Sequence, residues 1–280
     1  MKQPIAWALF LYAFVLGTCL NAQDDFRKPE NLKKRTIKVF QIPPEGGPEV
    51  ASYNLVQEFD EQGNITKQTQ FVLGGVEAVE FTCKNEYDVE KRLVGTQKED
   101  PLGLNQIKTV IKYGEKKSRT VTTENFTNQQ LVIRGVQTYG PEGKLTGETL
   151  ENKLFGVSGE RVYEYGADGN MKKMLQTYGD KKIYIAYVTD AKGRVTEETT
   201  FDSDDNQNKR QTYKWNGKGD NEEFAQFGSD DSRIFKMTYA YKYDTAGYPT
   251  EALAAQFSGD EPEPSAKARL VWEYELFDKK

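Results

Sequence analysis

The chain has 280 residues, of which 38 are Lys or Arg and 43 are Asp or Glu, giving a net charge of −5. An acidic chain with interspersed lysines is a poor candidate for nucleic-acid binding. The sequence contains no histidine, which excludes Ser-His-Asp and Cys-His catalysis, histidine metal sites and an imidazole proton shuttle.

Residues 1–22 have the layout of a secretory signal peptide: Lys2 precedes an apolar stretch over residues 5–16, and small or polar residues follow up to Ala22. The apolar stretch is too short to span a membrane comfortably, and no later segment is apolar enough to do so as a helix. We expect cleavage after Ala22; the alternative is a lipoprotein signal that uses Cys19. Cleavage leaves Cys83 alone, so no intramolecular disulfide can form. The predicted location is exported: periplasmic, cell-surface or secreted.

Residues 23–49 are predicted to be a charged, turn-prone leader with one candidate strand over residues 36–42, followed by the strand-breaking run 43–48. A repeated phrase then dominates residues 50–257. It consists of an aromatic residue, then Asp, Gly or Asn, then two variable residues and usually Gly. Its eight copies, some of them partial, begin at positions 59, 87, 113, 139, 165, 189, 215 and 243. The chain is therefore predicted to be an array of one small unit.

Each phrase predicts the tip of a β-hairpin. A type I turn favours Asp or Asn at its first position and Gly at its fourth, where the backbone adopts positive φ. The glycines predicted to close these turns are Gly63, Gly143, Gly169, Gly193, Gly219 and Gly247. Lys91 stands at this place in one copy and should cost about 1 kcal/mol relative to Gly. All spacings between copies are even, which keeps every side chain on its original face of the sheet.

The hairpin arms alternate with a period of two residues, as in Tyr239, Tyr241 and Tyr243, so that one face is aromatic and the other is small or polar. Many of the second arms finish on an aromatic residue, predicted to anchor the hairpin base: Phe71, Phe126, Tyr178, Phe201, Phe227 and Phe257. Residues 258–280 form a polar linker and a last strand over residues 269–277. Eight hairpins and two flanking strands would make eighteen strands, and open twisted sheets rarely exceed about ten without curling. We expect an all-β fold: an elongated, curled antiparallel β-meander of about eight tandem hairpin repeats, with its aromatic face inside.

The phrase resembles the YD repeat of the RHS family, most closely at residues 243–247 (Tyr-Asp-Thr-Ala-Gly) and 59–63 (Phe-Asp-Glu-Gln-Gly). The resemblance covers roughly residues 50–257 and implies a β-hairpin array in a secreted or surface-exposed protein. Long RHS proteins wrap such sheets around a toxin domain, whereas this chain is too short to enclose one. The signal ending at residues 21–23 is also similar to exported proteins of Bacteroidetes. The family has no catalytic residues to carry over.

A row of aromatic residues near four successive turns is the candidate ligand-binding site: Tyr163, Tyr187, Tyr213 and Tyr241, with Trp215 beside them. Flat rings with polar edges suit the faces of a polysaccharide. The competing interpretation is that the rings form the buried inner face of the curled sheet. The acidic link at residues 202–208 lacks the Gly and the bidentate Glu of an EF-hand loop. No catalytic residue, metal site or cofactor is predicted.

We therefore expect a non-enzymatic exported repeat protein, acting as a structural or binding scaffold at the cell envelope or outside the cell. Its expected partner is a protein or a polysaccharide, not nucleic acid. Two alternatives remain open. One is an outer-membrane β-barrel, which would share the even number of antiparallel strands, although arms such as residues 195–200 carry Glu on both faces. The other is a carbohydrate-binding protein that uses the aromatic face.

Overall fold

The computed structural model describes residue 29 and residues 31–43, 46–72, 76–99, 106–114, 120–127 and 129–278. The expected signal peptide, with its cleavage site and Cys19, lies outside the described residues, as does the beginning of the leader. Within the described ranges no helix has the length and apolar character needed to cross a membrane.

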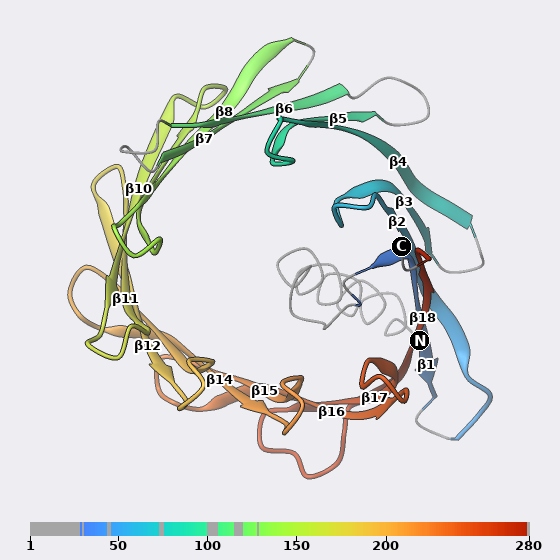
Figure 1. The fold of residues 1–280 in the computed structure, drawn as a ribbon. Helices are drawn as coiled ribbons and strands as arrows, with labels where there is room; N and C mark the ends of the chain where they lie inside the picture. Colours follow the sequence, from blue (N-terminus) through green and yellow to red (C-terminus); the bar gives the residue numbers. More distant parts are fainter. Residues whose placement is uncertain are drawn as a thin grey trace.

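Within the described ranges, eighteen strands form a single sheet, and each strand pairs antiparallel with the next along the chain. The strands are β1 (Leu32–Ile42), β2 (Val50–Phe59), β3 (Ile65–Val72), β4 (Val76–Tyr87), β5 (Leu93–Glu99), β6 (Gln106–Tyr113), β7 (Thr120–Thr127), β8 (Gln130–Tyr139), β9 (Leu145–Asn152), β10 (Val157–Tyr165), β11 (Met171–Tyr178), β12 (Lys181–Thr189), β13 (Val195–Phe201), β14 (Gln207–Trp215), β15 (Asn221–Phe227), β16 (Arg233–Tyr243), β17 (Pro249–Ser258) and β18 (Ala266–Leu276). The last strand, β18, also pairs with β1. The sheet is therefore a closed up-and-down barrel (Figure 1).

The expectation of an open, elongated meander is wrong. The pairing of β1 with β18 joins ten residue pairs, from Leu32 with Leu276 to Ile42 with Lys267, while β1 also pairs with β2. An open array would leave the backbone N–H and C=O groups of both end strands without sheet partners, and closure satisfies them. Sequence patterning indicated the two flanking strands near the ends of the repeat array. It could not indicate that these strands pair with each other.

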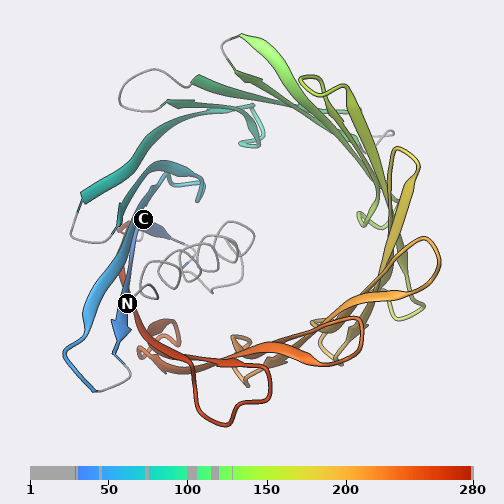
Figure 2. The same ribbon diagram turned by 180° about the vertical axis from the view of Figure 1, so that it is seen from behind.

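The repeated phrases lie at the hairpin tips of one end of the barrel. In the first phrase the Gly63 N–H donates to the Asp60 carbonyl at 3.0 Å, and the Asp60 N–H donates to the Asn64 carbonyl at 2.9 Å. The strand register shifts by one residue between Glu58 and Phe59, as expected for a turn closed by a glycine bulge. Gly63 has φ +81°, and Lys91 adopts φ +61° at the same place in its own turn. These tips curl toward the inside of the ring in both views (Figures 1 and 2).

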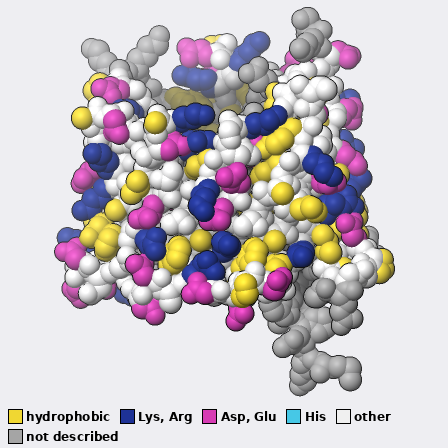
Figure 3. Space-filling view, turned by 90° about the horizontal axis from the view of Figure 1, so that it is seen from below, with side chains coloured by type: hydrophobic (Ala, Val, Ile, Leu, Met, Phe, Trp, Pro, Cys, Tyr) yellow, Lys and Arg dark blue, Asp and Glu magenta, His cyan; other side chains and the backbone are white. Residues whose placement is uncertain are grey.

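The two faces of the wall differ in chemistry. The register puts Lys214 opposite Glu223 on one face and Tyr213 opposite Phe224 on the other. The first face is the outside, where Lys and Arg lie interspersed with Asp, Glu and hydrophobic side chains (Figure 3). Three cross-strand ion pairs illustrate it: Lys214–Glu223 at 2.7 Å, Lys242–Glu251 at 2.6 Å and Lys38–Glu273 at 2.5 Å. The aromatic face therefore lines the lumen.

The main hydrophobic core lies on the luminal side of β1, β2 and β16–β18. It consists of Ile37, Val39, Tyr53, Leu55, Met237, Ala252, Ala254, Ala268, Leu270 and Trp272. The small side chain of Ala252, which is fully buried, lies opposite Tyr241 on β16 and Leu270 on β18. Small residues on the middle strand thus leave room for large ones on both neighbours. The strands around the closing seam carry most of the buried hydrophobic residues of the described chain.

Closure predicts a specific disulfide. Lys38 and Val271 lie directly opposite each other across the seam between β1 and β18, and directly opposite residues of an antiparallel pair are within the range that a disulfide spans. The double variant Lys38→Cys with Val271→Cys, in a Cys83→Ala background, should therefore oxidise to an intramolecular disulfide. Peptide mapping by mass spectrometry under non-reducing conditions detects it. The matched control, Lys38→Cys with Lys214→Cys, joins strands that do not pair and should remain reduced; equal cross-linking in both variants would contradict closure.

Candidate functional site: the luminal wall

The five aromatic residues of the candidate site lie near the tip end of β10, β12, β14 and β16, and all five face the lumen. The structure divides them into two groups. Tyr213, Trp215 and Tyr241 lie among other aromatic rings, whereas Tyr163 and Tyr187 lie among charged and amide side chains. The two groups differ in what they can do.

The first group packs as part of the core. The rings of Tyr213 and Phe224 are 5.3 Å apart between centroids, and those of Tyr241 and Trp272 are 6.3 Å apart. The Tyr241 hydroxyl donates to the Asn221 carbonyl at 2.9 Å, so its polar end is satisfied within the wall. Burial raises the pKa of Tyr241 well above its usual value. These contacts fix the rings in place.

The second group belongs to what we call the luminal polar cluster, formed by Glu148, Arg161, Tyr163, Tyr187 and Glu198. Arg161 Nη1 donates to Glu148 Oε2 at 3.0 Å, and the Tyr163 hydroxyl donates to the same oxygen at 3.2 Å. Burial and the neighbouring carboxylate of Glu198 raise the pKa of Tyr187 to about 12. This phenol therefore stays protonated at neutral pH and offers an O–H group rather than a base.

Amide side chains extend the luminal polar cluster, which then covers six strands from β8 to β13. Gln137 on β8 donates through Nε2 to Glu148 Oε1 at 3.2 Å, and Tyr139 donates through its hydroxyl to Gln137 Oε1 at 3.1 Å. On the other side, Arg161 Nε donates to Gln176 Oε1 on β11 at 3.1 Å. The cluster thus holds planar amide, guanidinium and carboxylate groups in fixed positions along the wall. Groups of this kind donate hydrogen bonds to hydroxyl groups and accept them.

Tyr178 joins this wall, although the sequence predicted it as a hairpin-base anchor like Phe201 and Phe227. Phe201 and Phe227 face outward, whereas Tyr178 pairs with Gly159 on the luminal face. Spacing explains the difference: Tyr178 follows its turn glycine by nine residues, and Phe201 and Phe227 follow theirs by eight. An odd difference of one residue moves a side chain to the opposite face of a strand. Counting from the turn glycine would have revealed its inward direction.

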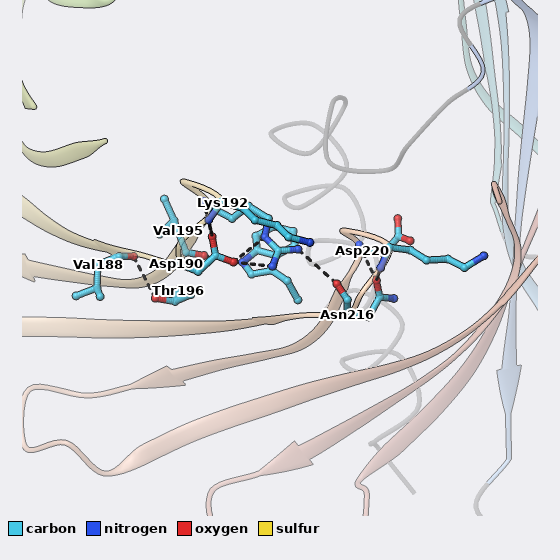
Figure 4. Close-up of polar contacts among 10 residues, drawn as sticks. Val188, Asp190, Lys192, Val195, Thr196, Asn216 and Asp220 are labelled. Atoms are coloured by element: carbon cyan, nitrogen blue, oxygen red, sulfur yellow. Dashed lines mark hydrogen bonds and ion pairs between the residues drawn. The ribbon is translucent and has the colours of Figure 1, made fainter. Parts of the chain in front are cut away.

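Neighbouring hairpin tips are joined by hydrogen bonds, which restrain the strands of the wall relative to one another (Figure 4). Arg194 forms an ion pair with Asp190 of its own turn and donates to the Asn216 carbonyl of the next turn at 3.4 Å. The first aromatic residue of a phrase also bonds to the preceding repeat, as Trp215 Nε1 does to the Val195 carbonyl at 2.7 Å. The phenols of Tyr113 and Tyr165 repeat this 20-residue contact. The aromatic residue of the phrase thus links one hairpin to the next.

Cys83 also faces the lumen, directly opposite Lys98. Burial raises the pKa of its thiol, an effect that Lys98 partly offsets, so the thiolate that would react is disfavoured. Among the described residues, no group of three or more Cys, Asp or Glu side chains is arranged to hold a metal ion. Binding through rings and hydrogen bonds is the chemistry that this wall offers.

Comparisons with known proteins find neither a matching family model nor a matching curated protein. Similar solved structures include a porin-like protein from Bacteroides uniformis, with a TM-score of 0.46 and 11% identity over 87% of this chain and 98% of that one. A porin-like protein from Bacteroides vulgatus has a TM-score of 0.33 and 12% identity over 85% and 97%. A LolA superfamily protein from Nitrosomonas europaea has a TM-score of 0.28 and 10% identity over 94% of each chain. These scores are too low to establish a shared fold.

The fold defines the class of this protein as a closed antiparallel β-barrel. The resemblance to the YD repeats of the RHS family is wrong: no family model matches, and the described hairpins close into a barrel. The physical reason lies in the phrase itself. Its Asp and Gly are selected by the backbone geometry of a type I turn with a bulge, which many unrelated hairpins share. Of the interpretations that the sequence left open, a barrel protein fits better than an open scaffold.

Proposed function

We propose that this chain is an exported barrel that binds a polysaccharide along its luminal wall and catalyses no reaction. The observation that carries the proposal is the luminal polar cluster, which is bordered by aromatic rings on a single inward face. Sugars present apolar C–H faces and hydroxyl edges, so they suit walls in which rings alternate with planar polar side chains. The protonated Tyr187 and the carboxylate of Glu198 supply a donor and an acceptor side by side.

Fixed geometry supports binding rather than a scaffold role alone. Arg161 is held by both Glu148 and Gln176, and the linked hairpin tips restrain the strands that carry them. Side chains that are already ordered lose little conformational entropy when a ligand arrives. The closed wall also surrounds the ligand, which suits an extended polymer.

An outer-membrane barrel is the second candidate, favoured by closure and by the even number of antiparallel strands. Lipid would then contact the outer wall, where charged residues near the middle of their strands form ion pairs: Lys38 of β1 with Glu273 of β18, and Arg210 of β14 with Glu197 of β13. A Lys or Arg on the lipid-facing side costs about 2–4 kcal/mol at the bilayer midplane. Several such residues on the outer strands favour water on both sides of the wall, so we propose a water-surrounded barrel outside the cytoplasm.

Two measurements test the proposal. Carbonate washing of membranes from expressing cells should release the protein; retention in the pellet would support the membrane barrel instead. The purified protein should be depleted from solution by at least one insoluble polysaccharide from a panel of cellulose, chitin and starch. The double variant Glu148→Gln with Glu198→Gln should weaken that depletion while the thermal midpoint stays unchanged. If no member of the panel depletes the protein from solution, the protein does not bind these three polysaccharides and the proposal is rejected for them.

A further inference from the structure

We propose that Tyr178, lying on Gly159, forms a stacking platform for one sugar ring of an equatorially linked polysaccharide, and that the luminal polar cluster holds the hydroxyl groups of the same sugar. The inference rests on the proposed function and names its binding subsite and its ligand class.

The platform depends on the missing side chain of Gly159. A Cβ atom at residue 159 would lie 2.8 Å from Tyr178 Cδ2, 3.3 Å from Tyr178 Cε2 and 3.2 Å from the backbone oxygen of Thr177. The Tyr178 ring thus occupies the space that any other side chain would fill. It nevertheless remains 45% exposed, whereas Trp272 in the core is 3% exposed. An aromatic ring supported by the wall and open to the lumen is suited to stacking rather than to core packing.

The wall beside the ring is low and apolar on the side of β9, while Lys181 on β12 lies directly opposite Tyr178 on the other side. Leu150, which is 44% exposed, lies between Gly135 on β8 and Gly159 on β10. Gly135 presents no side chain on the far side of Leu150, so the wall is low there. A pyranose ring therefore has a flat approach to Tyr178 that larger residues would block.

Polar side chains lie on the same two strands, two residues closer to the hairpin tip than Tyr178 and Gly159. Arg161 pairs with Gln176 two residues beyond the pair of Gly159 with Tyr178, a distance of about 7 Å along the strands. Their side chains are hydrogen-bonded to each other, and Arg161 is also bonded to Glu148. One sugar can therefore stack on Tyr178 and place its hydroxyl groups on this network.

Stereochemistry indicates which sugars fit. Arg161 is paired with Glu148 at 3.0 Å, while Lys181 lies directly opposite Tyr178 on β12, so charge does not exclude an acidic sugar. Sugars whose hydroxyl groups and glycosidic linkages are all equatorial keep flat C–H faces for stacking on a ring. The geometry points to β-1,4-linked glucose or N-acetylglucosamine.

Calorimetric titration of the purified full chain with cellohexaose and chitohexaose tests the platform, with maltohexaose for comparison. Tyr178→Ala should weaken binding of the preferred β-1,4-linked hexasaccharide about fivefold to tenfold. Tyr178→Leu should behave like Tyr178→Ala, and Tyr178→Phe should bind like the wild type, because stacking needs the ring and not the hydroxyl. Gly159→Ala should also weaken binding, since the added methyl group displaces the ring. The matched control is Tyr184→Ala on the outer wall, where Tyr184 stacks on Phe201 at 4.6 Å; its affinity should equal that of the wild type.

The outcomes separate the two proposals. If Tyr178→Leu and Gly159→Ala bind the hexasaccharide as tightly as the wild type, Tyr178 is not the stacking platform, although the sugar can still bind elsewhere in the lumen. An equal loss in Tyr184→Ala would also overturn it, because that residue lies outside the lumen. Tighter binding of maltohexaose would overturn the ligand class. Failure of the wild type to bind any hexasaccharide, together with no depletion by insoluble polysaccharides, would overturn both proposals.

Discussion

Ending the chain after Ser258, which removes β18, is expected to abolish the folded barrel. The strand pairs with both β1 and β17 and contributes Ala268, Leu270 and Trp272 to the core. Its loss would expose the edges of two long strands and uncover the luminal side of β1, and exposed edges of this kind promote aggregation. Size-exclusion chromatography should show aggregates in place of the peak of the full chain, and the cooperative thermal transition should disappear.

A shorter truncation provides the control for this result. Ending the chain after Phe277 removes only residues beyond β18 and keeps the bond from the Phe277 N–H to the Asn31 carbonyl. This variant should elute and melt like the full chain. An open array of hairpins would tolerate the longer truncation too, because each unit in such an array contacts only its neighbours. A soluble monomer lacking β18 that melts within a few degrees of the full chain would therefore contradict the closed barrel.

Replacement of Trp272 by Ala is expected to lower the free energy of unfolding by about 3–5 kcal/mol. The side chain is 3% exposed, lies opposite Ile37 across the seam and contacts the ring of Tyr241. Truncation leaves a cavity in a region where strands from both ends of the chain meet, and a hydrogen-bonded sheet can collapse into it only partly. Urea unfolding followed by circular dichroism measures the change.

Leu276→Ala is the matched control for this substitution. Leu276 lies on the same strand and is 46% exposed, so its truncation should cost well under half as much. A similar loss in both variants would show that the seam is not the centre of stability. A loss below about 1 kcal/mol for Trp272→Ala would show that the ring is not buried as described.

The turns and the alternation of side chains along the strands were predicted well from the sequence. The turn phrases mark hairpin tips, and Lys91 adopts the positive φ expected at its place in the turn. The period of two along the arms separated an aromatic face from a charged one, as Tyr213 and Lys214 show. These features depend on a few adjacent residues and on the fixed alternation of a strand, so they can be read without knowing the fold.

The candidate site was only partly predictable. Tyr163, Tyr187, Tyr213 and Tyr241 have equivalent places in their repeats, yet the neighbouring strands give them different surroundings. Glu148 lies beside Tyr163 and Glu198 beside Tyr187, whereas Phe224 and Ala252 lie opposite Tyr213 and Tyr241. Glu148 and Arg161 were not singled out, since nothing in their local sequence distinguishes them. Tyr178 was predicted to be a base anchor, although its spacing of nine residues from the turn glycine places it on the luminal face.

By itself, the sequence determined the positions of the turns and the alternation of the arms between an aromatic and a charged face, because these follow from neighbours a few residues apart. Only the tertiary structure decided that β1 pairs with β18, that the row of rings divides into a core and a polar cluster, and that the ring of Tyr178 rests on Gly159. The physical reason is sequence distance: Ile37 and Trp272 are 235 positions apart, and their pairing depends on the accumulated twist and curvature of every strand between them.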